Sequence, residues 1–514
     1  MQLFPFLAAI FVAVGSWCFG EERLLDPFET WGRPHSGEIA DAVNLCTGTY
    51  VHRSIDVSIE GCAPLYYGHF HTRDNTGKNS LREDRISNHE CVAEPVWKWG
   101  DYFISLYDDS GRRLHFKTPL NHPKDERFTL IPADKGLVYR GYSCSWDKGL
   151  GVITLRQKNG TTSIWRQGGG GKSPYLLRSV QRPNGVETVY SYEGDKLSRI
   201  ANQCHATRQE LNWLALSHDS NSTTVSSCTG ETVKYRFDTK RSWLSKQYRL
   251  KDVQNRSGTT HRYHYDDKGL NAPQVSMSTE TGLGGTEVHY VLGGPEVLGR
   301  PLFFGPFAHP DQGRVHKLKT LVGADGRTTA SHSFEYHKRS TDVVNDRGNL
   351  TRFHHCYGDI WKIEYFFDRA GRALIGQDRF FWGKEEKQGL LLAKDLRTPS
   401  DKIEACFSYD YDAVGNLTRE TFYGNLSGGQ KGYLERANDE AHPKSGGESF
   451  SRTFTYSTDG LNNRLSMSES TGRSYTYRYV PGTSLLEAQF EYDHGSPVAR
   501  TFFRYNALCQ RVEV

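Results

Sequence analysis

One short segment recurs along the chain and is clearest at Tyr411-Asp412-Ala413-Val414-Gly415-Asn416. An aspartate at the entry of a turn can accept hydrogen bonds from nearby backbone N–H groups. A glycine three residues later can take the left-handed conformation that closes the turn. Residues before the aspartate alternate with period two, so Tyr409 and Tyr411 share one face of a strand. The segment therefore predicts a β-hairpin with paired rings on one face.

The same pattern of an aromatic residue, an aspartate, two variable residues and a glycine occurs elsewhere. Its other clear copies are Tyr107-Asp108-Asp109-Ser110-Gly111-Arg112, Tyr265-Asp266-Asp267-Lys268-Gly269-Leu270 and Phe367-Asp368-Arg369-Ala370-Gly371-Arg372. Weaker copies are Val344–Asn349, Tyr456–Gly460, Tyr505–Gln510 and, by context alone, Tyr192–Leu197. Repeats in one register predict an all-β fold, a long antiparallel sheet of successive hairpins. The best candidate for a helix is Gln203–Leu216.

The residues singled out in this fold are structural. The turns are predicted to depend on Asp108, Gly111, Asp266, Gly269, Asp368, Gly371, Asp412 and Gly415. The rings predicted to pack the sheet are Tyr192, Tyr265 and Tyr411.

Composition limits the class of protein. The 514 residues carry 64 Lys+Arg and 60 Asp+Glu, a net charge of +4, and the pI is about 8.4. Because nucleic-acid binders usually combine a pI above about 9 with clustered basic residues, no nucleic-acid partner is expected. The mean hydropathy is −0.65, but 28 Tyr, 26 Phe and 10 Trp supply buriable surface that disordered chains lack. The chain is therefore predicted to fold.

The amino end predicts export. Residues 1–20 contain an apolar stretch, Phe4–Val14, that is too short to span a bilayer, and Gly20 precedes a polar start. We expect a signal peptide cleaved near Gly20 and a secreted or cell-surface protein. An uncleaved anchor is the alternative, because no Lys or Arg precedes the apolar stretch. No later segment resembles a transmembrane span.

Cys18 lies in the expected signal peptide, which leaves nine cysteines in the mature chain. They are spread along it, and no two of them form a C-x-x-C pair. They form neither a dense disulfide scaffold nor a zinc ribbon. Cys46 and Cys62 flank one expected hairpin and are a candidate disulfide. Buried thiols are an equally good interpretation for every cysteine.

The repeats and their setting resemble the YD-repeat, or rearrangement-hotspot (RHS), family, whose relatives include bacterial toxin shells and the teneurin receptors. Val43–Tyr50 with Asp56 and Pro64-Leu65 resembles the segment that opens such shells. The resemblance implies a sheet that spirals into a hollow shell able to enclose a carboxy-terminal polypeptide. We therefore expect three parts: a signal peptide (1–20), an N-terminal β region (21–180) leading into the shell, and the repeat shell (181–514).

The chain also departs from the family pattern. The D-P-x-G-L type motif that closes toxin-bearing members is missing, and Cys509 stands where a repeat glycine belongs. The sequence stops at Val514 inside another repeat, so either the reading frame is broken or the shell ends open. An open end would expose unpaired strand groups to another chain.

Chemical motifs point away from catalysis. Gly168–Ser173 lacks the first glycine of a phosphate-binding loop, and Pro174 disfavours the helix that such a loop requires. His69 with His71 and His354-His355-Cys356 do not have metal-site spacing. No cofactor or metal is expected. The predicted function is a non-enzymatic scaffold for encapsulation or contact. The alternatives are a carbohydrate- or protein-binding module and a hydrolase whose carboxylates come from distant strands.

Overall fold

The structure is a computed structural model of the chain. It describes residues 38–39, 43–45, 51–60, 63–72, 92–98, 101–107, 113–118, 127–132, 141–168, 174–241, 246–255, 260–266, 274–279, 284–290, 315–322, 327–356, 359–384, 387, 389–429, 432–436, 442–443 and 447–514. All the secondary-structure elements assigned within these ranges are β-strands. The same residues include no helix that is long and apolar enough to cross a bilayer.

The first strands are β1 (Glu38–Ile39), β2 (Val43–Asn44), β3 (Val51–Ile59), β4 (Leu65–Thr72), β5 (Val92–Lys98), β6 (Asp101–Tyr107), β7 (Arg113–Lys117), β8 (Arg127–Pro132), β9 (Ser143–Asp147), β10 (Val152–Arg156), β11 (Thr162–Gln167) and β12 (Tyr175–Gln181). The next are β13 (Val186–Glu193), β14 (Lys196–Cys204), β15 (Glu210–His218), β16 (Ser222–Ser227), β17 (Thr232–Arg241), β18 (Lys246–Asn255), β19 (Thr260–Asp266), β20 (Gln274–Thr279), β21 (Gly284–Tyr290), β22 (Val315–Val322), β23 (Arg327–Tyr336), β24 (Ser340–Val344) and β25 (Leu350–Cys356). The last are β26 (Asp359–Phe366), β27 (Leu374–Trp382), β28 (Leu391–Arg397), β29 (Ile403–Tyr411), β30 (Leu417–Gly424), β31 (Glu448–Tyr456), β32 (Arg464–Glu469), β33 (Arg473–Tyr479), β34 (Leu486–Asp493), β35 (Ser496–Phe502), β36 (Arg504–Tyr505) and β37 (Arg511–Glu513).

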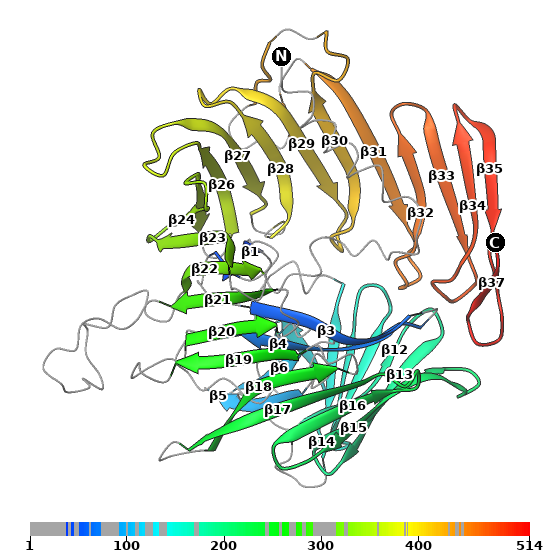
Figure 1. Ribbon diagram of the computed structural model, residues 1–514. Coiled ribbons are helices and arrows are strands. Elements are labelled where there is room, and N and C mark those ends of the chain that lie inside the picture. Colours follow the sequence, from blue (N-terminus) through cyan, green and yellow to red (C-terminus); the bar gives the residue numbers. More distant parts are fainter. Residues whose placement is uncertain are drawn as a thin grey trace, which may run out of the picture.

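Strands β5 to β35 form one ladder in which each strand pairs antiparallel with the next along the chain. The hairpin of the clearest repeat is typical: Tyr411 in β29 faces Leu417 in β30, and Cys406 faces Tyr423. The all-β fold of successive hairpins that the repeats predict is confirmed. We call the part of the ladder from β12 to β35 the wall; it runs around the molecule in Figure 1.

The prediction of a helix at Gln203–Leu216 is wrong. This segment holds the end of β14, a turn and most of β15. Alternate side chains of β15 are buried, at Asn212, Leu214 and Leu216, which is the period of a half-buried strand.

The ladder closes on itself near its start. Tyr175 and Leu176 of β12 pair with Ala93 and Val92 of β5, so β5 to β12 form a ring. The remaining residues of β12, Ser179 to Gln181, pair with β13 and begin the wall. Among the largest fully buried side chains of the molecule are Trp165, Ile104, Phe116, Ile153 and Leu155, all from this ring.

The hairpin β3–β4 and the residues before it pack against the wall. Tyr235 of β17 donates a hydrogen bond to Asp56 Oδ2 at 2.7 Å. Asn202 and Asn212, from β14 and β15, both donate to the Ala63 carbonyl, at 3.0 and 2.7 Å. Thr341 of β24 donates to the Leu45 carbonyl at 2.7 Å. The amino-terminal segment therefore joins strands that are far apart in the wall.

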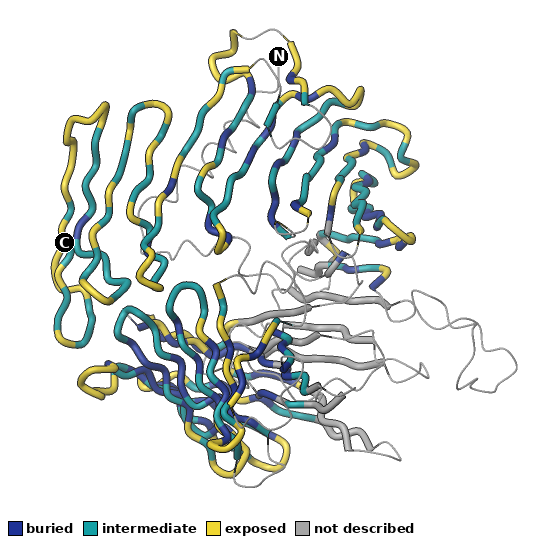
Figure 2. The backbone as a smooth tube through the Cα atoms, turned by 180° about the vertical axis from the view of Figure 1, so that it is seen from behind, coloured by how far each residue is buried: buried dark blue, intermediate teal, exposed yellow. Residues whose placement is uncertain are grey.

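Burial differs between the two halves of the molecule. The main hydrophobic core runs from Leu45 to Ile360 in sequence. Beyond it, the strands from β27 to β35 carry mostly half-exposed side chains, and Figure 2 shows the same contrast between the two parts of the tube. The later wall is thus a single layer of sheet, with little core of its own among the described residues.

Candidate functional site

The repeat turns share one hydrogen-bond arrangement. Asp412 Oδ1 accepts hydrogen bonds from the backbone N–H groups of Val414 and Asn416, at 3.0 and 2.8 Å. The Gly415 N–H donates to the Asp412 carbonyl at 3.1 Å, and Gly415 has a φ of 80°. This is a type I turn followed by a left-handed residue, a common hairpin connection.

Asp368 and Gly371 form a similar turn. Asp368 Oδ2 accepts from the Ala373 N–H at 2.7 Å, and Gly371 has a φ of 69°. Desolvation raises the pKa of Asp368, but backbone donors from Ala373, Arg372 and Ala370 outweigh it, and the net shift is downward.

Asparagine takes the place of aspartate in two weaker copies. Asn345 Oδ1 accepts from the N–H groups of Arg347 and Asn349. Asn506 Oδ1 accepts from those of Leu508 and Gln510, both at 2.9 Å. These asparagines were not among the predicted site residues, although their position in the repeat could have identified them.

Several predicted residues cannot be placed in this way. Asp108, Gly111, Gly269, the pair Cys46 and Cys62, and residues 1–20 lie outside the described residues. Tyr265 and Asp266 end strand β19, where they pair with Val275 and Gln274 of β20. The roles predicted for all of these residues stay predictions.

The tyrosine hydroxyls of the repeats bind the backbone of the neighbouring hairpin. Tyr192 and Tyr411 donate to the carbonyls of Leu177 and Leu391, each at 2.9 Å. The same contact is made by Tyr336 to Val315, Tyr456 to Leu417 and Tyr505 to Leu486. The sequence predicts that these rings pack the sheet, but not that their hydroxyls hold it. The recurrence of tyrosine before the turn was the available signal.

Turns from the end of the wall contact the ring, at β10, and the first hairpins of the wall. Arg156 Nη2 donates to the Gly460 carbonyl at 3.3 Å. The Ser484 N–H donates to the Pro183 carbonyl at 3.1 Å. The Cys204 thiol donates to the Ala507 carbonyl at 3.4 Å, between residues 303 apart in the chain.

We call this set of contacts the closing seam. One side is Arg156–Gly160, Pro183–Gly185 and Cys204, and the other is Gly460-Leu461, Ser484 and Ala507–Cys509. The fit is close, since a Cβ added at Gly160 would lie 3.0 Å from Leu461 Cδ2 and 3.2 Å from the Gly460 carbonyl oxygen. The wall therefore returns to its own start.

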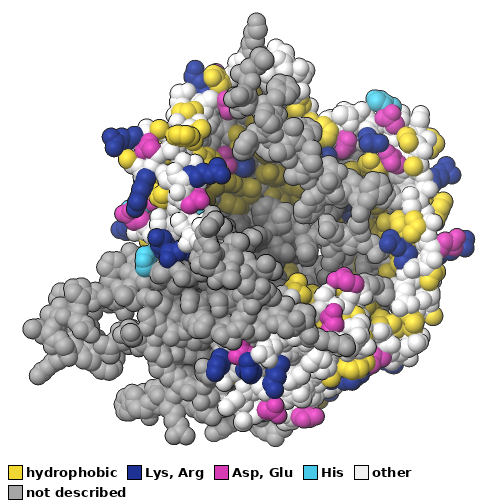
Figure 3. Space-filling model, in the orientation of Figure 1, with side chains coloured by type: hydrophobic (Ala, Val, Ile, Leu, Met, Phe, Trp, Pro, Cys, Tyr) yellow, Lys and Arg dark blue, Asp and Glu magenta, His cyan; other side chains and the backbone are white. Residues whose placement is uncertain are grey.

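The space that the wall surrounds is hollowed in the space-filling view. Hydrophobic side chains are visible on the part of the upper wall that faces this recess (Figure 3). Charged side chains of both signs cover the outer rim in the same view, mixed rather than segregated. The surface that faces the recess and the outer rim are thus chemically different.

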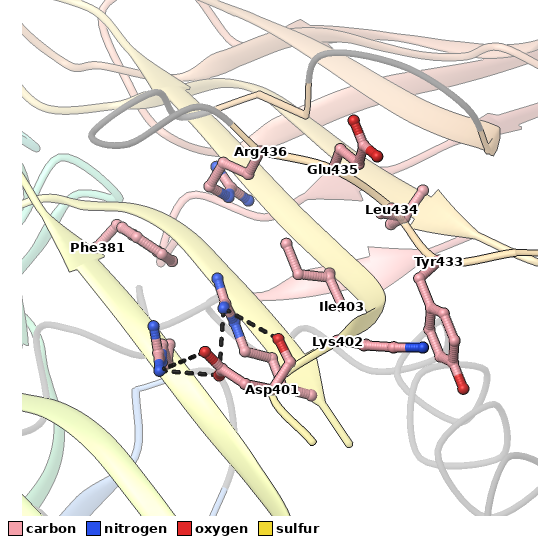
Figure 4. A pocket seen from close by; sticks show the side chains of 10 residues that line it. Phe381, Asp401, Lys402, Ile403, Tyr433, Leu434, Glu435 and Arg436 are labelled. Carbon is pink, nitrogen blue, oxygen red and sulfur yellow. Dashed lines mark hydrogen bonds and ion pairs between the residues drawn. The ribbon is translucent and has the colours of Figure 1, made fainter. Parts of the chain in front are cut away.

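A pocket of about 650 Å³ lies where residues 433–436 cross strands β27 to β29. Figure 4 shows Arg436, Ile403 and Leu434 along it, with Lys402 directed toward Tyr433. The Lys402 ammonium lies 4.8 Å from the centre of the Tyr433 ring, and the Arg436 guanidinium lies 4.8 Å from that of Phe381. Both cations thus lie on aromatic faces.

Buried carboxylate and thiol groups lie behind the pocket. Asp395, with a side chain that is 0% exposed, forms ion pairs with Arg397 at 2.6 Å and Arg436 at 2.7 Å. Arg436 also contacts the Cys406 sulfur. Burial raises the pKa of the Cys406 thiol to about 11 even though Arg436 opposes the shift. This cysteine is a protonated thiol at neutral pH and is not an activated nucleophile.

The histidines singled out in the sequence have structural neighbours. His354 Nε2 lies 2.6 Å from Glu364 Oε2, and the His354 ring lies 5.3 Å from the Trp361 ring. His355 Nε2 lies 3.3 Å from the Thr341 hydroxyl. Within the described part of the chain, no three His, Cys, Asp or Glu side chains are grouped so as to hold a metal ion.

No protein-family model and no curated protein matches this chain. Similar solved structures include TcdB2-TccC3-Cdc42, with a TM-score of 0.35 and 11% identity, covering 97% of this chain and 28% of that chain. TcdB2-TccC3 without its hypervariable C-terminal region has a TM-score of 0.27 and 10% identity, covering 98% and 28%. A mutant Tc holotoxin pore of Photorhabdus luminescens has a TM-score of 0.28 and 11% identity, covering 89% and 28%. The chain spans 28% of the length of these neighbours, and the structural overlap is low.

Proposed function

We propose that the chain is an exported, non-enzymatic scaffold of the YD-repeat kind that encloses a polypeptide. In this proposal residues 1–20 are a signal peptide, residues 21–180 lead into the shell and residues 181–514 form it. The observation that carries the proposal is the closing seam, because a wall that returns to its start surrounds the space beside it. The hydrophobic side chains facing the recess support the same function, since an unfolded polypeptide exposes apolar surface.

The test is protection of a guest polypeptide from protease. An unfolded reporter is fused after Val514, since the cargo of the family follows the repeats, and a protease is added under native conditions. The seam-opened variant, Arg156→Glu with Leu461→Asp, places a carboxylate on each side of the closing seam. Its control, Arg166→Glu with Leu465→Asp, makes the same chemical changes at two exposed positions outside the closing seam.

We expect the reporter to survive in the parent and control proteins and to be digested in the seam-opened variant. Equal digestion in all three proteins would contradict encapsulation. Equal survival in all three would show that protection does not depend on the closing seam, which would also contradict the proposal.

A second candidate function is a binding module for carbohydrate or protein. The specific observation is a group of exposed rings around β26: Trp361, Tyr365 and Phe367 are 42%, 38% and 72% exposed. Exposed aromatic side chains are good contact platforms. Binding to a glycan array that is lost in a Trp361→Ala, Phe367→Ala variant would favour this function, and an array without any signal would argue against carbohydrate.

A further inference from the structure

The last repeat turn has a cysteine in the glycine position. Cys509 has a φ of 61°, and its N–H donates to the Asn506 carbonyl at 3.0 Å, as Gly415 does to Asp412 at 3.1 Å. A residue other than glycine is strained in this conformation. The turn thus carries a side chain where the other described turns of the same pattern, at Gly348, Gly371, Gly415 and Gly460, carry none.

That side chain lies across the closing seam from Cys204. The Cys509 thiol is a hydrogen-bond neighbour of the Cys204 sulfur, and Cys204 itself donates to the carbonyl of Ala507. Gly185 leaves the space that the Cys509 sulfur occupies, since a Cβ on Gly185 would lie 2.6 Å from it. Gly185 is fixed beside Cys204 because the His205 N–H donates to its carbonyl at 2.8 Å.

We propose that Cys204 and Cys509 are a disulfide-forming site that closes the seam covalently. The inference rests on the contacts of the closing seam and does not require an enclosed polypeptide. It joins the first hairpins of the wall to its last turn. A cross-link between residues this far apart removes much of the conformational freedom of the unfolded chain.

The reaction is thiol–disulfide exchange with a small-molecule disulfide such as oxidised glutathione. Cys509, the more exposed of the two, attacks one sulfur of the reagent as a thiolate and releases one glutathione thiolate. Cys204, which is 1% exposed, then attacks the Cys509 sulfur of the mixed disulfide and releases the second. The two protein thiols lose two protons and two electrons, and the reagent disulfide is reduced to two thiols.

The surroundings of Cys204 suit the second step. The Thr207 side chain, the Thr207 backbone and the Ala206 backbone lower the pKa of the Cys204 thiol, and the Cys509 thiol adds to the effect. Burial instead raises the pKa of Cys144 and Cys406. Cys204 is therefore a better thiolate nucleophile than these two buried cysteines.

The test treats the folded full-length protein with oxidised glutathione, blocks remaining thiols and maps the peptides without reduction. We expect a peptide pair linked through Cys204 and Cys509, faster migration on a non-reducing gel and a higher melting temperature than in reductant. The variant Cys509→Gly restores the glycine of the repeat and should lose all three effects while staying folded. The control Cys228→Ser, at an exposed cysteine, should keep them.

Two results would overturn the inference. One is a folded protein in which Cys204 and Cys509 are each recovered as glutathione adducts or blocked thiols and never as a linked pair. The other is a cross-link of Cys509 to a different cysteine. If Cys509→Gly proves unstable, Cys204→Ser in the same peptide map decides, because it removes the link without changing the left-handed turn.

Discussion

The fourth position of each repeat turn must tolerate a positive φ. Gly348, Gly371, Gly415 and Gly460 have φ values of 81°, 69°, 80° and 81°. The N–H groups of Gly348, Gly371 and Gly415 donate to the backbone carbonyl of the first residue of their turns. In the turn of Gly460, Asp459 Oδ1 instead accepts from the Leu461 N–H. An added Cβ is strained in this region whatever space surrounds it. The spacing of aspartate and glycine is thus a local physical requirement, which is why the sequence predicts it.

The first prediction concerns Gly415. Gly415→Ala should lower the free energy of unfolding by about 1 kcal/mol or more, because alanine must adopt the left-handed conformation there. The control is Gly429→Ala, at a glycine without a positive φ whose nearest neighbour would be a serine hydroxyl. Denaturant unfolding of both variants checks the difference. If both variants unfold at the same denaturant concentration, the turn role of Gly415 is wrong.

The second prediction concerns pH and Glu187. Its side chain is 6% exposed, accepts from Gln203 at 2.9 Å and from Gln181 at 3.1 Å, and pairs with Arg208. Burial raises the pKa of Glu187, but the donors and Arg208 outweigh burial and lower it below the ordinary 4.5. A lowered pKa means that the charged form stabilises the fold above the ordinary pKa. This stability is lost as the pH falls below about 4.5 and through the folded-state value.

Glu187→Gln should therefore reduce the free energy of unfolding by about 1 kcal/mol or more at pH 7. The gap between variant and parent should shrink as the pH falls below about 4.5 and the Glu187 carboxylate becomes protonated. Melting temperatures from pH 7 to pH 3 measure this gap, with Glu404→Gln, at an exposed position of β29, as the control. A gap that is constant with pH would contradict the role of the carboxylate charge.

At the scale of the element, several neighbouring strands are joined by a tyrosine side chain as well as by the backbone ladder. The tyrosine before a repeat turn reaches the carbonyl of a leucine in an adjacent hairpin, as Tyr411 does at Leu391 and Tyr456 does at Leu417. These hydroxyls fix how successive hairpins lie against one another. Such links matter most after β26, where the described wall has little hydrophobic core.

The third prediction removes one of these links. Tyr411→Phe keeps the ring and should cost about 1 kcal/mol, because the hydroxyl–carbonyl hydrogen bond is lost in a partly buried setting. Tyr433→Phe is the matched control at a half-exposed ring that packs under Lys402. Urea unfolding of the two proteins gives the comparison. Equal midpoints would mean that the Tyr411 hydroxyl does not hold the wall.

The elements themselves could largely be predicted, because hairpin signals are local. Asp412 and Gly415, or Asn184 and Gly185, lie within a few residues of the strands that they connect. The helix predicted at Gln203–Leu216 is wrong, because a turn between two nine-residue strands falls inside this segment, whose leucine spacing also suits a helix. The pairing of β5 with β12 and the contact of Arg156 with Gly460 join distant residues. No local pattern encodes them, so the ring and the closing seam could not be predicted.

At the scale of the whole molecule, the early and the late parts of the wall are held in different ways. The ring and the early wall are held by the main core, whereas the later wall depends on hairpin hydrogen bonds and on the closing seam. Among the described residues, the contacts of the closing seam join this thin sheet to the ring and to the first hairpins of the wall. The closing seam is therefore the part of the architecture whose loss should change the overall shape without unfolding the strands.

The last prediction tests this consequence by small-angle X-ray scattering. A compact chain of this length would have a radius of gyration of about 24 Å, and a wall around a recess should exceed that value. The seam-opened variant, Arg156→Glu with Leu461→Asp, should have a larger radius of gyration and maximum dimension than the parent, with an unchanged β-type circular dichroism spectrum. The control Arg166→Glu with Leu465→Asp should match the parent. The variant removes the Arg156 contact with Gly460 and adds a carboxylate on each side of the closing seam. If all three proteins scatter alike, these contacts do not hold the later wall in place.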